Sequence, residues 1–466
     1  MISLVERAGG LVLAVISDIH ASNRSVYSSM RTDDSPSFRT EHPMDSSRQL
    51  YMLHDPVHAI KCIRNNWITE KDKRITITLP GGQRVTAKWS DIRATYESEK
   101  GNVVKRTTLT SCAINPSSIE KVKVAPVLQV FNDKIVAALA QDKRNETAAF
   151  VYHILKMWKI VNNKSTTAHV HLNDPDRMPI TSPECQQLQF LSEMSSAVKQ
   201  MSAVRRGKAR HGTFTRETTE SLTQSLDGLI ALSKYLLLEK GLKFVLLGVF
   251  QSDCIEGEFG VYRQAFGGLY YITFEQVLTA AKGRRLQLFQ ALAIDLDSVD
   301  HQKSECCNNL DLSPDDMDIF DSLEQLALEN VSHDERNTLF YIAGYVAMKE
   351  GIRSTEIPPS SEDCETSDCE FTHLLSRGKL TYPPTELFQF SLLCYTFFAK
   401  SPRTCKRQLL NVFEQIHDSY ATFPKNTSVL KRLANTYMNG YVKKFSDLHG
   451  YYKAADQRKK QKLSAD

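Results

Sequence analysis

Two short apolar runs, each followed by an aspartate, constrain the fold of this chain more than any other feature. The run GGLVLAVIS (9–17) shows no alternation and ends at Asp18, and the run LYMLH (50–54) ends at Asp55. A continuous apolar run is typical of a strand buried on both faces of a parallel or mixed sheet that helices surround. We therefore expect two buried strands that carry acidic side chains to the end of one sheet.

The rest of the chain predicts mostly helices. Asp55-Pro56 is a standard helix start, with Asp as the N-cap and Pro at the first helical position. Segment 22–47 indicates a helix fragment and a loop, and the alternating segment 74–89, with its Pro-Gly-Gly turn, predicts a hairpin. We expect helices over 119–163, 217–240, from near 253, over 325–352 and over 385–450, and a third apolar strand over 243–250.

Charge and cysteine content exclude some classes of protein. The 466 residues carry 58 Lys and Arg against 54 Asp and Glu, a formal charge of +4, so any nucleic-acid surface must be a local patch. No membrane span is expected, because charges interrupt the most apolar stretch, 228–250. The ten cysteines are interpreted as reduced thiols, although Cys364, Cys369 and His373 leave open a structural zinc site that lacks an evident fourth ligand.

Acidic residues at the ends of elements are candidate metal ligands. Asp18 follows the first apolar run, and Glu256 lies in the first turn of a predicted helix in FQSDCIEGEFGVYRQ. Carboxylates of this kind hold Mg²⁺, and two such ions can drive phosphodiester chemistry. The alternatives are structural: Asp18 caps the turn after its strand, Asp55 caps its helix, and Asp253 and Glu256 form a capping box.

Four segments resemble the P-element family of DNA transposases, which includes the THAP-domain transposases of animals. They are VISDIHASN, DPVHAIKCIRNNWIT, FQSDCIEGEFGVYRQ, and YIAGYV with FTHLLSRGKLTYPP. The resemblance implies an RNase H-like core interrupted by a GTP-binding insertion, and Mg²⁺-dependent cut-and-paste of DNA at terminal inverted repeats. It implies that Asp18 and Glu256 are catalytic metal ligands, and that Asn162 and Asp253 contact a bound nucleotide.

The sequence also departs from that family. The family's first catalytic Asp lies on an opening strand that is not found upstream of Asp18, and the N-terminal zinc module that binds DNA in relatives is absent. Lys159 stands where the family has an acidic nucleotide contact, and a cation cannot accept hydrogen bonds from guanine. We expect an N-terminally truncated copy that is inactive alone. The alternatives are a non-catalytic protein that binds DNA or partner subunits, and a guanine-nucleotide-binding regulatory module.

Basic residues mark a candidate DNA surface. They are Arg205, Arg206, Lys208 and Arg210 in one stretch, and Lys282, Arg284 and Arg285 in another. Such residues grip phosphates with release of counterions, although a solvated charged face explains them equally well. The final cluster RKKQK (458–462) suits nuclear import. The expected partner is DNA at transposon ends, with self-association also considered and no membrane partner.

The predicted class is α/β plus α. We expect residues 1–72 and 216–292 to form the RNase H-like core without its opening strand, and residues 73–215 to form the mostly helical insertion. An acidic linker over 293–324 then leads to a helical C-terminal domain with a basic tail, over 325–466.

Overall fold

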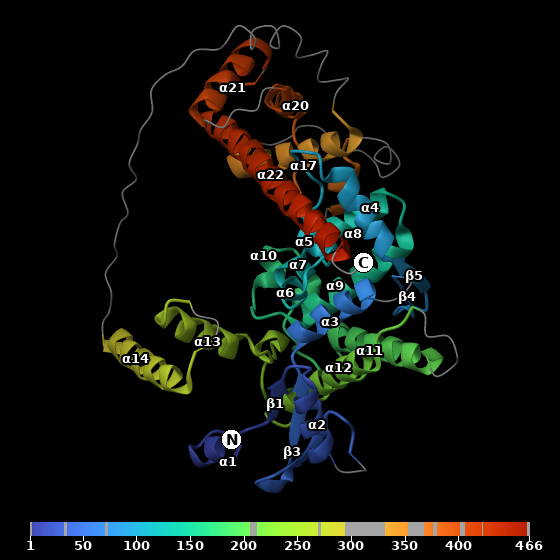
Figure 1. Cartoon of the computed structure of the whole chain (residues 1–466), viewed down its shortest axis with the longest axis vertical. Coiled ribbons are helices and arrows are strands. Elements are labelled where there is room, and N and C mark those ends of the chain that lie inside the picture. Colours follow the sequence, from blue (N-terminus) through green and yellow to red (C-terminus); the bar gives the residue numbers. More distant parts are fainter. Residues whose placement is uncertain are drawn as a thin grey trace.

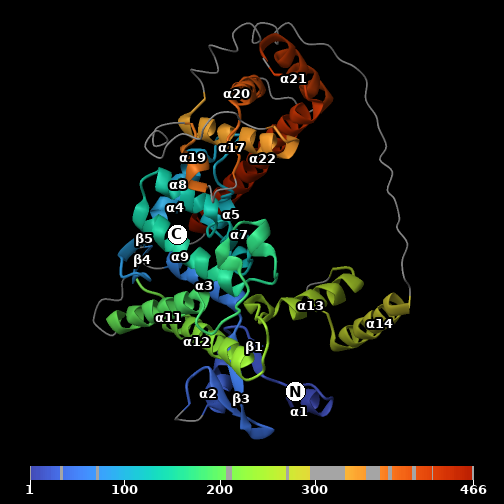
Figure 2. The ribbon, with the colours of Figure 1, turned by 180° about the vertical axis from the view of Figure 1, so that it is seen from behind.

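A computed structural model describes residues 2–31, 35–69, 73–205, 212–268, 272–293, 331–352, 368–375, 380–400, 406–421 and 423–463. The described part combines a small mixed sheet, a hairpin and many helices (Figures 1 and 2). The expected acidic linker lies outside these residues except for its first position. The domain boundaries given above stay predictions.

A three-stranded sheet lies at one end of the molecule (Figure 1), with strand order β1-β3-β2. Strand β1 (Ala14–Ser17) runs parallel to β3 (Asp45–His54), and Ser17 lies opposite His54. Strand β2 (Arg39–His42) pairs antiparallel with β3 on its other side. Both apolar runs thus contain a strand, and the parallel pairing brings their carboxyl ends together. The first strand is shorter than 9–17, and β2 was not predicted.

Helices both near to and distant from the strands in sequence lie beside this sheet. Helix α2 (Ala21–Met30) follows β1, and α3 (Pro56–Thr69) begins directly after β3, as Asp55-Pro56 predicted. Helix α12 (Arg216–Leu238) packs on β3, and it lies between the sheet and α11 (Gln186–Arg205) in Figure 1. The approach is close because Gly228 lacks a side chain: a Cβ there would lie 2.3 Å from Cδ2 of Leu53.

The segment between α3 and α11 is the predicted hairpin followed by helices. Strands β4 (Arg74–Thr78) and β5 (Arg84–Lys88) pair antiparallel. The apolar core between this segment and α3 centres on Trp67, whose ring centroid lies 5.1 Å from that of Trp89 and 5.0 Å from that of Phe150. The helices here are α4 (Trp89–Glu99), α5 (Ser111–Ile114), α6 (Ser118–Lys121), α7 (Ala125–Leu128), α8 (Asp133–Gln141), α9 (Asn145–Val161), α10 (Ala168–His171) and the 3₁₀ helix η1 (Pro175–Arg177).

The predicted strand over 243–250 is wrong. Val245 forms only an isolated bridge with Ile180, and a 3₁₀ helix, η2 (Leu247–Val249), follows. Gly248 approaches the backbone of Asn163, where a Cβ would lie 2.7 Å from the Asn163 carbonyl oxygen. Since the backbone turns here to meet the end of α9, it cannot extend into a sheet.

Helices α13 (Asp253–Ala265) and α14 (Phe274–Ala293) form an arm that projects from the body in Figures 1 and 2. None of the residues of α13 is buried. Only the beginning of α13 reaches the sheet end of the molecule, which matters for the site described below.

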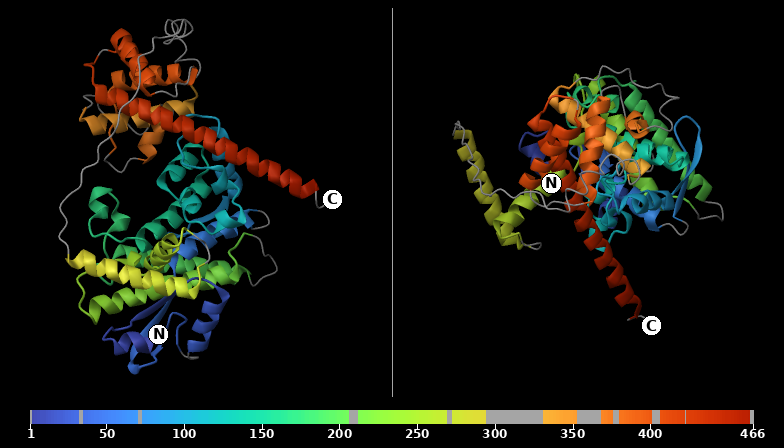
Figure 3. Two further views of the ribbon diagram at one scale, coloured as in Figure 1. Left: turned by 60° about the vertical axis from the view of Figure 1, so that its left-hand side comes forward. Right: turned by 90° about the horizontal axis from the view of Figure 1, so that it is seen from above.

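The C-terminal helices have their own apolar core. They are α17 (His333–Glu350), α19 (Glu370–Leu375), α20 (Thr385–Lys400), α21 (Lys406–Tyr420) and α22 (Thr427–Leu463). Figure 3 shows the far end of α22, which carries the RKKQK cluster, extending beyond the body. The buried Arg106 connects this unit to the preceding helices, with nitrogens 2.7 Å from Glu99, 3.0 Å from Asp142 and 2.9 Å from Asp334.

Two expectations from composition can be compared with the structure. Cys369 is disulfide-bonded, contrary to the interpretation of all ten cysteines as reduced, so its thiolate is not available for the zinc site considered above. Cys62, Cys112, Cys185, Cys254 and Cys394 are free. Among the described helices, none combines the length and apolar character needed to cross a bilayer.

Candidate active site

Asp18 lies directly after β1 and is half-buried. Its Oδ1 accepts hydrogen bonds from the backbone N–H of His20 at 2.9 Å and from the Asn23 amide at 2.6 Å. Burial acts to raise the pKa of Asp18, but these hydrogen bonds and the nearby charge of His58 outweigh it and lower the pKa. Asp18 thus caps its turn, as the structural alternative proposed, and is held as a carboxylate.

Asp55 lies at the matching end of β3 and is fully buried. Its N–H donates to the carbonyl of Ser17 at 2.8 Å, which fixes the two strand ends side by side. Its Oδ1 accepts from the N–H of Val57 at 2.8 Å and caps α3, as predicted. Its other oxygen, Oδ2, accepts from the hydroxyl of Ser252, just before α13.

Ser252 brings Glu256 to the same place. The Ser252 hydroxyl lies 3.2 Å from Oε1 of Glu256 in addition to its contact with Asp55, so one short side chain bridges the two carboxylates. Ser252 is also the N-cap residue of α13, without a side-chain cap bond. The capping box proposed for Asp253 and Glu256 is therefore not what the structure shows.

His58, which is partly exposed, and Lys61, which is buried, complete the cluster from the first turns of α3. The Nε2 of His58 lies 3.5 Å from Oε1 of Glu256, and the Nζ of Lys61 lies 3.4 Å from the same His58 nitrogen. The charge of His58 also acts on Asp18. Asp18 follows β1 directly, and Ser252 and Asp55 hold Glu256 at the end of β3, so both acids lie at the same end of the sheet.

The cluster offers ligands of the types that bind divalent ions. One ligand atom each from Asp55, His58 and Glu256 lies within 4.8 Å of the others. Glu256 is more than half exposed, whereas both oxygens of Asp55 already accept protein hydrogen bonds. The accessible carboxylates, Asp18 and Glu256, suit a hard cation such as Mg²⁺. Their catalytic role stays a prediction.

The expected nucleotide contacts lie near the start of the arm, and each has a protein partner. Asn162 ends α9, and its Oδ1 accepts from the Gln251 amide at 3.0 Å. The carboxylate of Asp253 pairs with Lys164. Lys159 is buried and pairs with Asp133 at 2.8 Å and Asp174 at 3.2 Å. A buried ion pair thus occupies the position at which the family resemblance calls for an acid.

The expected DNA-binding residues do not form one surface among the described residues. Arg205 is the last residue of α11, whose end lies on the side of the molecule opposite to α14 in Figures 1 and 2. Lys282 is exposed on α14, and Arg284 lies 3.6 Å from Glu258 of α13. Arg285 belongs to α14. Arg206, Lys208 and Arg210 lie outside the described residues.

Sequence reasoning missed Ser252 and the position of His58 and Lys61. His58 lies on α3, with its Nε2 3.5 Å from Oε1 of Glu256. One signal was available: residues 55, 58 and 61 of DPVHAIK recur every three positions, which places them on neighbouring turns of one helix face. No local signal points to Ser252, because its partner Asp55 is almost two hundred residues away.

Comparison with known proteins identifies the class first. The solved structure of the Drosophila P element transposase strand transfer complex matches with a TM-score of 0.50 and 20% identity, covering 60% of this chain and 61% of that chain. The fold described here is therefore the fold of a P-element-type DNA transposase over that part.

A sequence relative points the same way. The Transposable element P transposase of Drosophila melanogaster is 24% identical over 274 residues, which cover 56% of this chain and 34% of the relative. The chain is similar to this transposase, and the match spans about a third of that relative's length. No protein-family model matches the chain.

Proposed function

We propose that this chain handles DNA as a cut-and-paste transposase of the P-element type, with Mg²⁺-dependent cleavage and strand transfer at terminal inverted repeats. The sheet β1–β3 is then part of an RNase H-like core. The observation that supports the proposal most is that Asp18, after β1, and Glu256, held by Ser252 against Asp55 after β3, lie at the same end of the sheet although more than two hundred positions separate them.

Each residue of the cluster has a defined task in this proposal. Asp18 and Glu256 would hold Mg²⁺ through their carboxylate oxygens, and the bound ion would supply activation of a water or a 3′-hydroxyl and stabilisation of the leaving oxygen. Ser252 positions Glu256 against Asp55, and Asp55 fixes the start of α3. His58 lies 3.5 Å from Glu256 and orients its carboxylate.

Metal binding tests the site directly. We expect Glu256→Gln and Asp18→Asn each to weaken Mn²⁺ binding at least tenfold, measured by calorimetry or by electron paramagnetic resonance of free Mn²⁺. Glu258→Gln is the matched control, since Glu258 lies on the same helix but faces Arg284. Equal Mn²⁺ affinity in the wild type and in both acid variants would refute the site.

Cleavage tests the reaction. The first of the three carboxylates that the family resemblance calls for was not found in this sequence, so we expect at most weak nicking of supercoiled DNA in Mg²⁺ or Mn²⁺ by this chain alone. Robust nicking that disappears in Glu256→Gln would show that two acids suffice, and would contradict the expected inactivity while supporting the site.

A second candidate function is binding of DNA without cleavage. The His58 imidazole already lies 3.5 Å from Glu256, with the Lys61 ammonium 3.4 Å from the same imidazole nitrogen, and it would compete with a metal ion for that carboxylate. In this case the logarithm of DNA affinity falls linearly with the logarithm of salt concentration, and Mg²⁺ produces no cleavage. Absence of DNA binding at low salt would exclude both candidates.

Guanine-nucleotide binding fits this chain poorly. Asn162, Asp253 and Lys159 all engage protein partners, and Lys159 cannot accept a hydrogen bond from guanine. We therefore propose that nucleotide recognition has been lost here. Titration calorimetry with GTP should give no saturable heat. Micromolar binding by the wild type would overturn this proposal.

Location in the nucleus and self-association are further proposals that accompany a DNA-acting function. The RKKQK cluster in the last turns of α22 is the candidate import signal. Replacing its lysines and arginine by glutamine in a fluorescently tagged chain should shift the protein out of the nucleus. Unchanged nuclear signal would assign import to another segment.

A further inference from the structure

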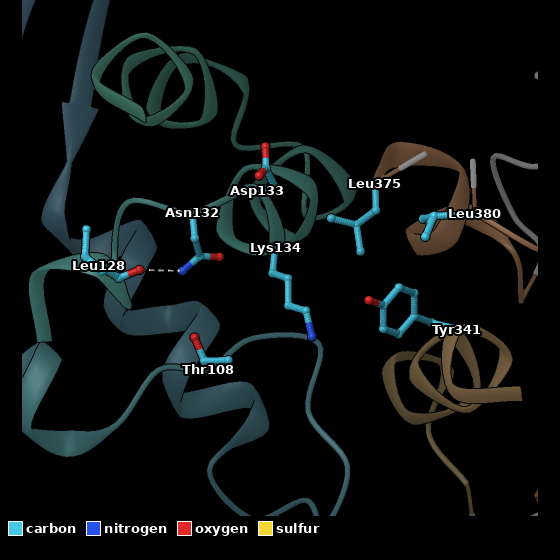
Figure 4. Close-up of a pocket in the computed structure, with 8 residues that line it drawn as sticks. All are labelled: Thr108, Leu128, Asn132, Asp133, Lys134, Tyr341, Leu375 and Leu380. Carbon is cyan, nitrogen blue, oxygen red and sulfur yellow. Dashed lines mark hydrogen bonds between the residues drawn. The ribbon is translucent and has the colours of Figure 1, made fainter. Parts of the chain in front are cut away.

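A cavity of about 400 Å³ lies between the α7–α8 region and the C-terminal helices. None of the residues of the acidic cluster lines it. Figure 4 shows the side chains that line it. They are Thr108, Leu128, Asn132, Asp133, Lys134, Tyr341, Leu375 and Leu380. The volume falls within the range of small-molecule pockets, roughly 300–1,000 Å³. Both regions contribute side chains to this one space, and beside it they share a small apolar cluster around Phe371.

Lys134 gives the cavity its charge. Its ammonium nitrogen lies 5.0 Å from the centroid of the Tyr341 ring, a cation–π contact. Burial lowers the pKa of Lys134, and the positive charge of Lys443 lowers it further, against a smaller opposite effect of Glu99. An ammonium in this setting lacks the solvation that a carboxylate or phosphate oxygen would replace.

The acid of the cavity wall does not neutralise Lys134. The carboxylate of Asp133 binds Lys159, with Oδ1 2.8 Å from the Lys159 nitrogen, and in Figure 4 it points away from Lys134. Glu99 is committed to Arg106 and Thr107. Among the described residues, no ion pair joins a carboxylate to Lys134, so its ammonium can pair with an anion that enters the cavity.

The remaining lining separates into a polar and an apolar side. The Tyr341 hydroxyl and the Lys134 ammonium face the same space in Figure 4. The Asn132 amide is already used, because it donates to the carbonyls of Leu128 and Gln129 and caps α8. Leu375 and Leu380 lie beside Tyr341 in Figure 4, across the space from Lys134, and give that side apolar surface. A ligand that fits therefore has one anionic group and an apolar body.

We propose that this cavity binds a small organic anion, an apolar or aromatic body with one carboxylate or phosphate group. The anion contacts Lys134 and the Tyr341 hydroxyl, and the body packs on Leu375 and Leu380. The ligand touches both the α7–α8 region and the C-terminal helices, so its binding stabilises their association. This inference does not depend on the proposed transposase function.

Calorimetry and thermal unfolding of the full chain test the site. The probes are benzoate and phenyl phosphate. Benzyl alcohol represents the aromatic body without an anionic group, and inorganic phosphate represents the anionic group without an aromatic body. We expect one-to-one binding of at least one aryl anion and a rise in Tm with its concentration. Each half alone should bind at least tenfold more weakly. The aryl anion that binds more tightly distinguishes a carboxylate from a phosphate ligand.

Variants locate the binding. Lys134→Met should weaken binding of the aryl anion at least tenfold, whereas Lys243→Met, at an exposed lysine, is the matched control and should leave it unchanged. Leu375→Trp fills the apolar wall and should also abolish binding, which keeps the test valid if Lys134→Met folds poorly. The proposal fails if no aryl anion saturates the wild type, or if a folded Lys134→Met or Leu375→Trp chain binds as the wild type does.

Discussion

Tyr27 joins the two parallel strands through one hydroxyl. Its oxygen lies 2.9 Å from the carbonyl oxygens of both Val15 in β1 and Leu53 in β3. The side chain is buried, and burial raises the pKa of Tyr27 to about 12. A single residue of α2 thus helps to hold together the two strand ends that carry Asp18 and Asp55.

Alkaline pH should therefore weaken the fold through Tyr27. The folded state favours the protonated phenol, so this contribution is complete below the ordinary tyrosine pKa of about 10 and is lost as pH rises through the folded value. We expect the free energy of unfolding to fall more steeply between those two pH values in the wild type than in Tyr27→Phe. Denaturant unfolding at a series of pH values measures this, and identical slopes would contradict it.

Two glycines in helices should respond oppositely to alanine. Gly228→Ala forces a methyl group to within 2.3 Å of Leu53, so we expect a loss of about 1–3 kcal/mol in the free energy of unfolding. Gly257→Ala, in open space on α13, should be neutral or stabilise by up to about 1 kcal/mol. Urea denaturation of both variants provides the measurement. Equal effects would mean that α12 does not approach β3 this closely.

At the level of residues, the sequence predicted which acids lie in the candidate site better than it predicted their contacts. Asp18, Asp55 and Glu256 were chosen from their places at the ends of elements, and the structure brings all three to one end of the sheet. The partners were missed because each contact is formed by tertiary packing. Ser252 meets Asp55, and Lys159 meets Asp174, only once helices distant in sequence have docked.

Among the elements, the arm formed by α13 and α14 should be the least protected from hydrogen exchange. Helix α13 has no buried residue, whereas most residues of α9 are buried. Amides that open locally exchange much faster than amides that exchange only on global unfolding. We expect α13 peptides to exchange roughly 100-fold or more faster than α9 peptides in mass spectrometry. Comparable protection would show that the arm is covered in solution.

Elements with a strong local signal were predicted well, and elements defined by context were not. The hairpin β4–β5 and the start of α3 follow from turn residues and an N-cap, which act within a few residues. Strand β2 lies in a polar segment and exists because β3 offers it a partner. Segment 243–250 has a strand-like composition, but its backbone meets Asn163 and turns instead.

Across the whole molecule, Arg106 should be the most sensitive connection between the C-terminal helices and the rest. It is 1% exposed and pairs with Glu99, Asp142 and Asp334, the last of which belongs to α17. Arg106→Leu leaves the buried Glu99 carboxylate without its cation, so we expect a loss of about 3–5 kcal/mol. Arg336→Leu is the control, since the Arg336–Asp368 pair is 24% exposed on both sides and should cost far less. Chemical denaturation compares them, and similar losses would argue against a connecting role.

The half-buried strand β1 has a consequence of its own. Among the strands that the structure describes, it pairs with β3 alone and so lies at the edge of the sheet, and it is four residues long. A border strand is a template for a further chain, but four residues provide only about 13 Å of backbone. Any polypeptide added alongside gains few ladder bonds and must bring side-chain anchorage of its own. Strand addition at this edge therefore requires a specific partner, and repeated addition into fibrils is disfavoured.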